Sequence, residues 1–359
     1  MYPKIIYIPS LDGLRGIAIF FVLLAHGSYG HINGWIGVDL FFILSGYLIT
    51  NLLQLEQKEF RKISYKNFYV RRALRLFPAL IFAILLAYFS WPLTEHIYKE
   101  SNKKIAIASS LLYFNNIISD DVTGVLNPLW SLSVEEHFYI LWPIVFSSVL
   151  NKVSLYKRNI LFFLLITIVS LFRIYAFRYE SDLKFSFYEI NYYKFTLCRI
   201  DSILLGALLA FTPPAPSLEK ALIKYSNSIF IFLFILFSFI LLYINYYSKF
   251  INYGGFILTN ILCLFCVTYT ITQPKHPIFS SRLFMYIGKR SYGIYLLHQP
   301  IFILLEQFRE QNNYYNLIFI SFLRLLVPIL IAELCFQIVE KPILKLKNRF
   351  NGLKSAYAT

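Results

Sequence analysis

The sequence predicts an all-α fold, a polytopic transmembrane helical bundle of about ten spans with one further short re-entrant or interfacial segment. Of its 359 residues, 58% are hydrophobic and 19% aromatic, and the mean hydropathy is +0.59. These values lie outside the range of ordinary soluble domains. The basic residues give a formal net charge of +15 and fall in short links between apolar stretches. That pattern is typical of cytoplasmic loops facing anionic lipid, and it argues against nucleic-acid binding.

The first three spans are expected at residues 12–30, 35–54 and 77–93. Residues 56–76 separate the second from the third, and only two acidic side chains accompany the basic ones there. So many cations in a short loop fix it in the cytoplasm by the positive-inside rule. The basic residues are Lys58, Arg61, Lys62, Lys66, Arg71, Arg72 and Arg75.

Residues 104–118 are apolar but too few for a span, which needs roughly 20 residues. Counting them as a span would place the basic link with Lys152, Lys157 and Arg158 outside the cell. We therefore expect a re-entrant or interfacial segment, which keeps every basic link in the cytoplasm.

The remaining spans are expected at 128–150, 159–177, 196–211, 228–247, 252–272, 291–309 and 315–339. This count places both termini in the cytoplasm. Residues 212–220 contain three prolines and are expected to form a stiff connector. Residues 1–343 are predicted to be a single membrane-embedded domain, and residues 344–359 a short basic cytoplasmic tail. No cleavable signal peptide is recognised, and no extracellular domain is expected after the last span.

Ionisable residues in the first two spans are the main functional signal. Asp12, Arg15, His26 and Asp39 would each cost several kcal/mol in hydrocarbon unless paired or hydrated. Asp12 and His26 are 14 residues apart, or roughly 21 Å along a helix, so His26 is expected past the membrane midplane. Histidine can take and return a proton near neutral pH. We interpret His26 as a candidate base, oriented by Asp39 or Glu135; the alternative is a satisfied core histidine.

The arginines at positions 71, 72 and 75 are candidates for binding a phosphorylated cytoplasmic donor. Arg71 and Arg75 are expected to share the face of a helix that ends at Pro78. Guanidinium groups suit bidentate binding of phosphate oxygens. A topology anchor that binds lipid headgroups is the alternative.

Glu135 is expected about two turns into a span that is entered from the outer side. Glu135 and Glu136 would point about 100° apart, so only one is expected to face a shared interior. Glu136 is expected to face a neighbouring cation or the interface. Glu135 would orient a histidine or pair with an arginine such as Arg15 or Arg199.

Two further stretches carry polar residues at or within predicted spans. Arg199 and Asp201 head one span. His298 precedes Pro300 in another, where it is either a second base or a helix-breaking corner bonded to backbone carbonyls, and the corner is favoured. Residues 45–47 are expected to make a tight helix contact, because small residues such as Ser45 and Gly46 let helices approach closely. The pair Cys263 and Cys266 has no second pair or nearby histidine to complete a zinc site, so no metal is predicted.

Several of these stretches match one family in order along the chain. They are DGLRG with His26, GVDLFFILSGYLI, FYVRRALRLFP, LWSLSVEEHFYILWP, RIDSILLG, SYGIYLLHQP and the final EKP. From about residue 9 to 343 the sequence resembles the acyltransferase-3 family, the integral membrane O-acyltransferases of bacterial surface polysaccharides. The resemblance implies a multi-pass protein of the bacterial cytoplasmic membrane. It also implies transfer of an acyl group, usually acetyl from acetyl-CoA, to a hydroxyl of a glycan handled at the outer side.

The resemblance also implies residue roles. The family's essential histidine falls on His26, and its tryptophan-to-glutamate motif on Trp130 and Glu135. Its first-span acid and arginine fall on Asp12 and Arg15, and its arginine motif on Arg71, Arg72 and Arg75. Many members carry a fused periplasmic hydrolase-like domain, and this chain resembles the stand-alone members. Supporting roles towards substrate or structure are expected for Tyr47, Trp130, Arg199, Tyr295 and His298.

The predicted mechanism is direct transfer, in which His26 deprotonates the acceptor hydroxyl for attack on the thioester. An acyl-histidine intermediate is the competing mechanism. The predicted partners are membrane lipids, acyl-CoA on the cytoplasmic side and a glycan acceptor towards the outer side. The alternative function is a transporter or flippase that uses the intramembrane charges as a substrate or proton pathway.

Overall fold

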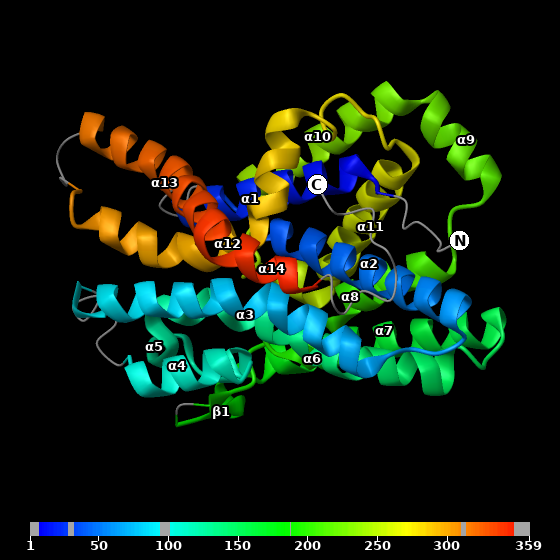
Figure 1. The fold of residues 1–359 in the computed structure, drawn as a ribbon, viewed down its shortest axis with the longest axis horizontal. Coiled ribbons are helices and arrows are strands. Elements are labelled where there is room, and N and C mark those ends of the chain that lie inside the picture. The colour runs from blue at the N-terminus through cyan, green and yellow to red at the C-terminus, as the bar shows by residue number, and fades with distance from the viewer. Residues whose placement is uncertain (1–6, 28–31, 94–100, 187, 310–313, 348–359) are drawn as a thin grey trace.

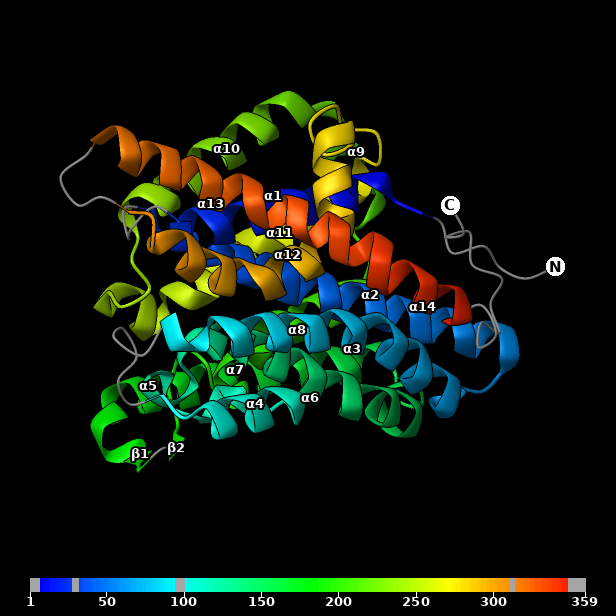
Figure 2. The same cartoon turned by 60° about the vertical axis from the view of Figure 1, so that its left-hand side comes forward.

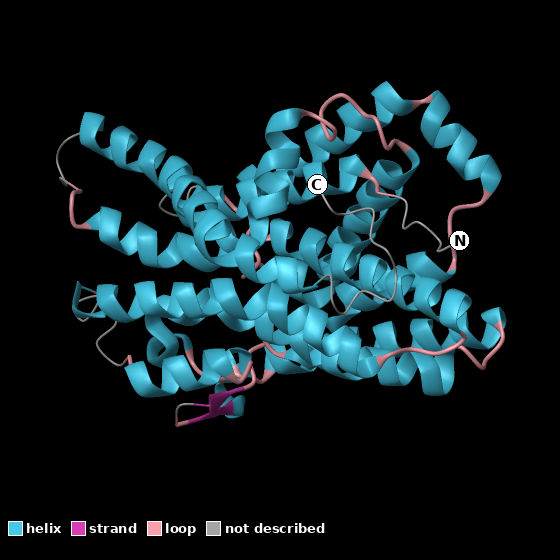
Figure 3. Cartoon of the chain, viewed as in Figure 1, coloured by secondary structure: helices cyan, strands magenta, loops and turns pink. Residues whose placement is uncertain are grey.

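The all-α prediction is confirmed. A computed structural model describes residues 7–27, 32–93, 101–186, 188–309 and 314–347, and helices make up nearly all of them (Figure 3). The strands found in these ranges form one small antiparallel hairpin of β1 (Lys184–Phe185) and β2 (Tyr188–Glu189).

The helices follow one another along the chain from the N-terminus to the C-terminus (Figure 1). The α-helices are α1 (Pro9–Gly27), α2 (Ile36–Phe60), α3 (Tyr65–Ser90), α4 (Lys103–Leu111), α5 (Asp120–Thr123), α6 (Trp130–Val145), α7 (Leu155–Arg178), α8 (Thr196–Phe211), α9 (Pro216–Lys224), α10 (Ser226–Tyr243), α11 (Phe256–Thr272), α12 (Arg282–Glu306), α13 (Tyr314–Cys335) and α14 (Lys341–Lys347). The 3₁₀ segments are η1 (Trp91–Leu93), η2 (Asn115–Ile117), η3 (Gly124–Leu129) and η5 (Glu180–Leu183), and the π segments are η4 (Phe146–Leu150), η6 (Ile251–Gly255) and η7 (Phe336–Glu340).

The protein is a multi-pass membrane protein, but the expected number of spans is not confirmed. In the described ranges, seven helices are long and apolar enough to cross a membrane, or eight if α8 and α9, bent by 106°, count as one span. Each of the ten predicted spans does contain a helix. However, α6 and α8 have only 16 residues each, about 24 Å against a hydrocarbon core of about 30 Å.

Three local predictions need correction. Residues 56–76 are mostly helical, because α2 continues to Phe60 and α3 begins at Tyr65. Pro78 does not end its helix, since α3 runs on to Ser90. The connector at 212–220 is only partly irregular, because α9 begins at Pro216, where a proline fits the first helical turn.

The segment at 104–118 is too short to cross a membrane, as expected. Its helix, α4, has nine residues, about 14 Å in length. Of the predicted tail, the described part up to residue 347 belongs to α14, which packs against α3. Residues 348–359 lie outside the described residues.

Glycines set the two closest helix contacts of the bundle. A Cβ added to Gly46 on α2 would lie 1.9 Å from the carbonyl oxygen of Ile203 on α8, and one on Gly206 would lie 1.9 Å from that of Ile43. The tight contact expected around residue 46 is therefore confirmed. A Cβ on Gly288 of α12 would lie 1.7 Å from the carbonyl oxygen of Asp12, so α1 and α12 also meet backbone to backbone.

The helices that carry the predicted histidines and the Arg199 network lie in the middle of the bundle. In Figure 2, α1, α2, α8, α11 and α12 are surrounded by α3 and α6 on one side and by α10 and α13 on the other. Only 17% of the most apolar stretch of α10 is buried, and 22% of that running from α13 into α14. Their outward faces are therefore suited to lipid, while the polar residues of the central helices are shielded from it.

Candidate functional site

Two histidines meet at one end of the parallel helices α1 and α12. His26 lies in the last turn of α1 and is exposed, whereas His298 on α12 is fully buried. Their ring centroids are 5.0 Å apart, with the rings tilted by 59°. The helix contact at Gly288 sets this register, because it holds Asp12, fourteen residues before His26, against α12.

His298 is anchored to its own helix. Its Nδ1 atom lies 2.5 Å from the carbonyl oxygen of Tyr295. The expected bond to a backbone carbonyl is present, but the expected helix-breaking corner is wrong, because α12 continues through Pro300 to Glu306. The Nε2 atom of His298 is shielded from solvent and has no hydrogen-bond partner in the described part of the chain.

Tyr295 ties this part of α12 to the start of α6. Its hydroxyl donates to the carbonyl oxygen of Pro128 at 2.7 Å and accepts from the Ser131 hydroxyl at 2.6 Å. Trp130 is next in sequence to Ser131, and its ring lies 5.0 Å from that of Tyr193. Tyr295 therefore lies beside the histidine pair, with its ring 5.5 Å from that of His298, while Trp130 packs against Tyr193 and Arg199.

Asp39 is not the partner of His26. Its Oδ1 accepts from Nη2 of Arg199 at 2.5 Å, and both side chains are fully buried. Across the described residues, no carboxylate makes an ion pair or hydrogen bond with His26. A buried guanidinium needs a counter-ion more than a histidine at a helix end does, and Asp39 supplies it.

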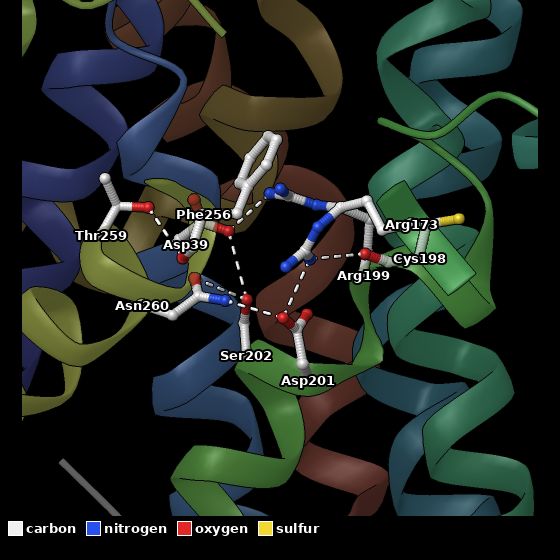
Figure 4. Close-up of polar contacts among 9 residues, drawn as sticks. All are labelled: Asp39, Arg173, Cys198, Arg199, Asp201, Ser202, Phe256, Thr259 and Asn260. Carbon is white, nitrogen blue, oxygen red and sulfur yellow. Dashed lines mark hydrogen bonds and ion pairs between the residues drawn. The ribbon is translucent and has the colours of Figure 1, made fainter. Parts of the chain in front are cut away.

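The Arg199 pair belongs to a buried polar network that joins four helices (Figure 4). Ser202 donates to Asp39 and to Asn260, and Asn260 donates to Asp201 at 3.1 Å. Arg173 on α7 donates to Asp201 at 2.9 Å. Aromatic rings surround the Arg199 guanidinium, those of Phe42, Trp130, Tyr193 and Phe256. Arg199 therefore supports the packing of α2, α7, α8 and α11.

Glu135 lies in a different cluster, around Arg72 of α3. The Ser45 hydroxyl donates to its Oε1 at 2.8 Å, and Tyr139 donates to its Oε2 at 3.4 Å. The Arg72 guanidinium lies 3.5 Å above the Tyr139 ring and interacts electrostatically with both Glu135 and Glu136. Glu136 therefore faces a neighbouring cation, as expected. Glu135 also interacts electrostatically with Arg15, one of the two arginines expected near it, whereas the other, Arg199, pairs with Asp39.

Arg15 and Arg75 extend this cation cluster towards the beginning of α1. Arg15 pairs with Asp12 at 2.8 Å, and the Tyr7 hydroxyl also donates to Asp12. Arg75 interacts electrostatically with both Arg15 and Arg72. The Nε and Nη2 atoms of Arg72 are shielded and have no hydrogen-bond partner in the described ranges. We call Arg15, Arg72 and Arg75 the arginine cluster.

Arg71 turns away from the arginine cluster. It pairs with Glu56 of α2 at 3.1 Å, and the backbone N–H of Ser64 donates to the other oxygen of Glu56. Glu56 therefore links the end of α2 to the start of α3. Sequence reasoning missed this acid and also missed Tyr139. The signal for Tyr139 was its position four residues after Glu135, which places both on one helix face.

Tyr47, the last of the predicted site residues, lies outside the histidine pair, the arginine cluster and the Arg199 network. Tyr47 is half-buried and packs in the apolar cluster around α1, α2, α10 and α11. The four cysteines are free and buried. In the described ranges, no three His, Cys, Asp or Glu side chains are grouped so as to hold a metal ion.

Comparison with known proteins gives one consistent result. Residues 8–333 match the acyltransferase domain of the acyltransferase-3 type. The chain is 32% identical to the peptidoglycan O-acetyltransferase OatA of Listeria monocytogenes over 97% of its own length and 58% of that protein. It is 30% identical to the O-acetyltransferase OatA of Staphylococcus aureus, over 94% of its length and 57% of the relative.

The chain thus spans less than two thirds of the relatives that it matches. No solved structure matches it. The match covers the helices that carry the histidine pair, the arginine cluster and the Arg199 network. The protein therefore belongs to the acyltransferase-3 family.

Proposed function

We propose that this protein is an O-acetyltransferase of the bacterial cytoplasmic membrane that transfers acetyl from cytoplasmic acetyl-CoA to a hydroxyl of a cell-wall glycan outside. The observation that carries the proposal is the layout of α1. Arg15 lies in the first half of this helix and His26 in its last turn, 11 residues apart, or roughly 16 Å. A phosphate-binding group and a base so separated suit a long donor that reaches from one to the other.

The arginine cluster is the proposed site for the donor's phosphates. Arg72 has buried guanidinium nitrogens without a hydrogen-bond partner in the described ranges, and Arg75 and Arg15 add positive charge beside it. Charge-assisted bonds from guanidinium to phosphate are stronger than bonds between neutral groups. When bound, acetyl-CoA supplies an activated thioester, and its flexible arm would carry the acetyl group towards His26.

His26 is the proposed general base. A ring nitrogen takes the proton of the acceptor hydroxyl while that oxygen bonds to the thioester carbonyl carbon. The carbon–sulfur bond then breaks, and the imidazolium returns the proton to the departing sulfur. An acyl-histidine intermediate remains the competing mechanism, and acetylated enzyme trapped with donor alone would favour it.

Aromatic rings offer a path for the acceptor. The ring of Tyr193 stacks on Tyr246 at 4.3 Å, and Tyr246 lies 3.9 Å from Tyr247. Tyr247 is exposed, so the row begins at the surface and ends at Trp130, next to Ser131. Exposed aromatic rings bind ligands through large, rigid apolar faces, and the apolar faces of sugar rings suit them. The name of the Listeria relative supports peptidoglycan as the acceptor.

The proposed orientation in the membrane follows the basic residues. The link between α2 and α3, with Arg61 and Lys62, would face the cytoplasm, and His26 would lie near the outer surface. Both termini would then be cytoplasmic. The terminal residues 1–6 and 348–359 lie outside the described residues.

The test is acetylation of the cell wall in cells that express either the parent chain or His26→Ala at matched membrane levels. Acetylation by the parent that is lost in the variant is the expected result. Equal acetylation by both would reject His26 as the base. Absence of acetylation from both, together with no CoA binding by the purified parent, would reject the proposed function and favour a transporter.

A further inference from the structure

The backbone fixes His298 in one tautomer. A carbonyl oxygen only accepts hydrogen bonds, so the Nδ1 atom that lies 2.5 Å from the Tyr295 oxygen carries the hydrogen. Neutral imidazole has a single N–H, and Nε2 of His298 therefore carries a lone pair. This atom is buried and has no donor within the described ranges. A buried acceptor left in this state is unfavourable, so the site calls for a donor.

His26 is the group best placed to supply that donor. Its ring centroid lies 5.0 Å from that of His298, and a small rotation of the exposed ring can direct one N–H at Nε2. Catalytic hydrogen bonds are often long in structures without substrate. Neutral His26 has one N–H and one lone pair. With the N–H directed at His298, the lone pair is left for the acceptor hydroxyl.

The two acids expected to orient His26 are used elsewhere. Asp39 neutralises Arg199, and Glu135 bonds Ser45 and Tyr139 beside Arg72. A general base still needs a third group that fixes its tautomer and direction, as the aspartate does in a Ser-His-Asp triad. The described residues offer His298 in that place.

We propose that His298 is the positioning residue of His26, accepting a hydrogen bond at Nε2 from the His26 ring. The chain of bonds runs from the Tyr295 carbonyl through His298 to His26 and then to the acceptor hydroxyl. His298 takes up no proton. When His26 becomes an imidazolium, one N–H stays on His298 and the other returns its proton to the CoA sulfur. The inference rests on the proposed acetyl transfer, because only a base needs its lone pair directed at a substrate.

The surroundings of His298 are built to hold it still. The Tyr295 hydroxyl bonds both Pro128 and Ser131, which fixes this turn of α12 against α6. The Phe302 ring lies 5.6 Å from the His298 ring on the opposite side along the helix. A ring anchored in this way can orient a mobile neighbour without moving itself.

Two substitutions separate positioning from a purely structural role. His298→Gln places an amide oxygen near the position of Nε2 and keeps the acceptor, but it loses the bond to Tyr295. His298→Asn places an amide nitrogen near Nδ1 and keeps that bond, but it loses the acceptor. The two variants have similar polarity, so each is the control for the other.

The first readout is the rate of acetyl transfer by the purified protein in lipid nanodiscs. We expect kcat to fall about 100-fold in His298→Asn, the size of effect that misplacing a reacting group causes, and about 10-fold or less in His298→Gln. The KM for acetyl-CoA should stay unchanged in both, because the arginine cluster is untouched. The reverse order, with Asn active and Gln inactive, would overturn the proposal in favour of a structural anchor.

The second readout needs no turnover, so it judges the inference separately from the proposed function. Nitrogen-15 NMR of histidine-labelled protein distinguishes ring nitrogens that carry hydrogen from those that do not, and the His26 signals are those lost in His26→Ala. We expect one tautomer of His26 in the parent and in His298→Gln, and a mixture in His298→Asn. The same tautomer populations in all three proteins would overturn the proposal, even if acetyl transfer is observed.

Discussion

Arg199 on α8 and Asp39 on α2 form an ion pair at 2.5 Å in which both side chains are fully buried. The pair joins the same two helices that Gly46 and Gly206 bring together, seven residues before each glycine. Neither charge can reach water, so each depends on the other and on the hydrogen bonds around it. A residue with the sequence pattern of a catalytic acid is in this way part of the scaffold.

Removal of either charge alone should strongly destabilise the protein. We expect Asp39→Leu or Arg199→Met to lower the free energy of unfolding by about 3–5 kcal/mol, because each leaves an unpaired buried charge. The double variant should be more stable than either single variant. Denaturant unfolding in detergent micelles measures all three, and additive losses in the double variant would contradict the pairing.

Replacement of Arg72 should weaken the donor complex. We expect Arg72→Gln to cost about 1.5–3 kcal/mol of CoA binding, the value of a hydrogen bond to a charged group. Arg71→Gln is the matched control, since Arg71 pairs with Glu56, and its effect should be smaller. Titration calorimetry with CoA gives both affinities. Equal losses of CoA affinity in the two variants would show that Arg71 also binds the donor. Full affinity in Arg72→Gln would exclude Arg72 from the donor site.

A methyl group at Gly46 should force α2 and α8 apart. The new Cβ would lie 1.9 Å from a backbone oxygen, and overpacking of this kind costs about 1–3 kcal/mol. Gly27→Ala is the control, because its Cβ would meet no atom closer than 3.6 Å and it shares the gain in helix propensity. Thermal unfolding of the two variants should differ clearly. Equal melting temperatures would show that the helices can separate at little cost.

His276 should make stability depend on pH. Burial lowers the pKa of its imidazole below the ordinary value of about 6.5, and its ring packs against Phe230 and Phe279. The unfolded chain therefore binds a proton more readily than the folded one, so stability should fall as the pH drops below about 6.5.

The measurement for His276 compares unfolding between pH 5 and pH 8 in the parent and in His276→Gln. The variant should lose less stability than the parent on acidification. Identical pH profiles would show that His276 titrates alike in both states.

The sequence was sufficient to predict a helix in each of the ten expected spans, because the apolar stretches are separated by basic or polar links. It was insufficient for the boundaries of α2 and α3. The polar residues between Leu55 and Leu74 read as a loop, yet they continue both helices past the apolar region. The prediction that a helix ends at Pro78 was also wrong, because a proline in a long membrane helix breaks one hydrogen bond without ending the helix.

Sequence reasoning gave candidate residues for the site but not their partners. His26 was singled out by the cost of burying its polar group, and Arg72 by the suitability of guanidinium for phosphate. Their partners depend on how the helices pack, and hydropathy carries no information on that. Asp39 is the clearest case, because its place near the start of α2 fits a histidine partner as well as it fits Arg199.

The contact between α1 and α12 at Gly288 also affects how the distant histidine rings are placed. From Gly288 to His298 is ten residues, roughly 15 Å of helix. If the two helices pivoted about Gly288 by about 10°, the imidazole rings would shift relative to each other by roughly 2.6 Å. The backbone contact is therefore a pivot whose effect is largest at the histidine pair. On the proposed function, a mutation screen for lost acetyl transfer should recover substitutions at Gly288, roughly 15 Å from the histidines.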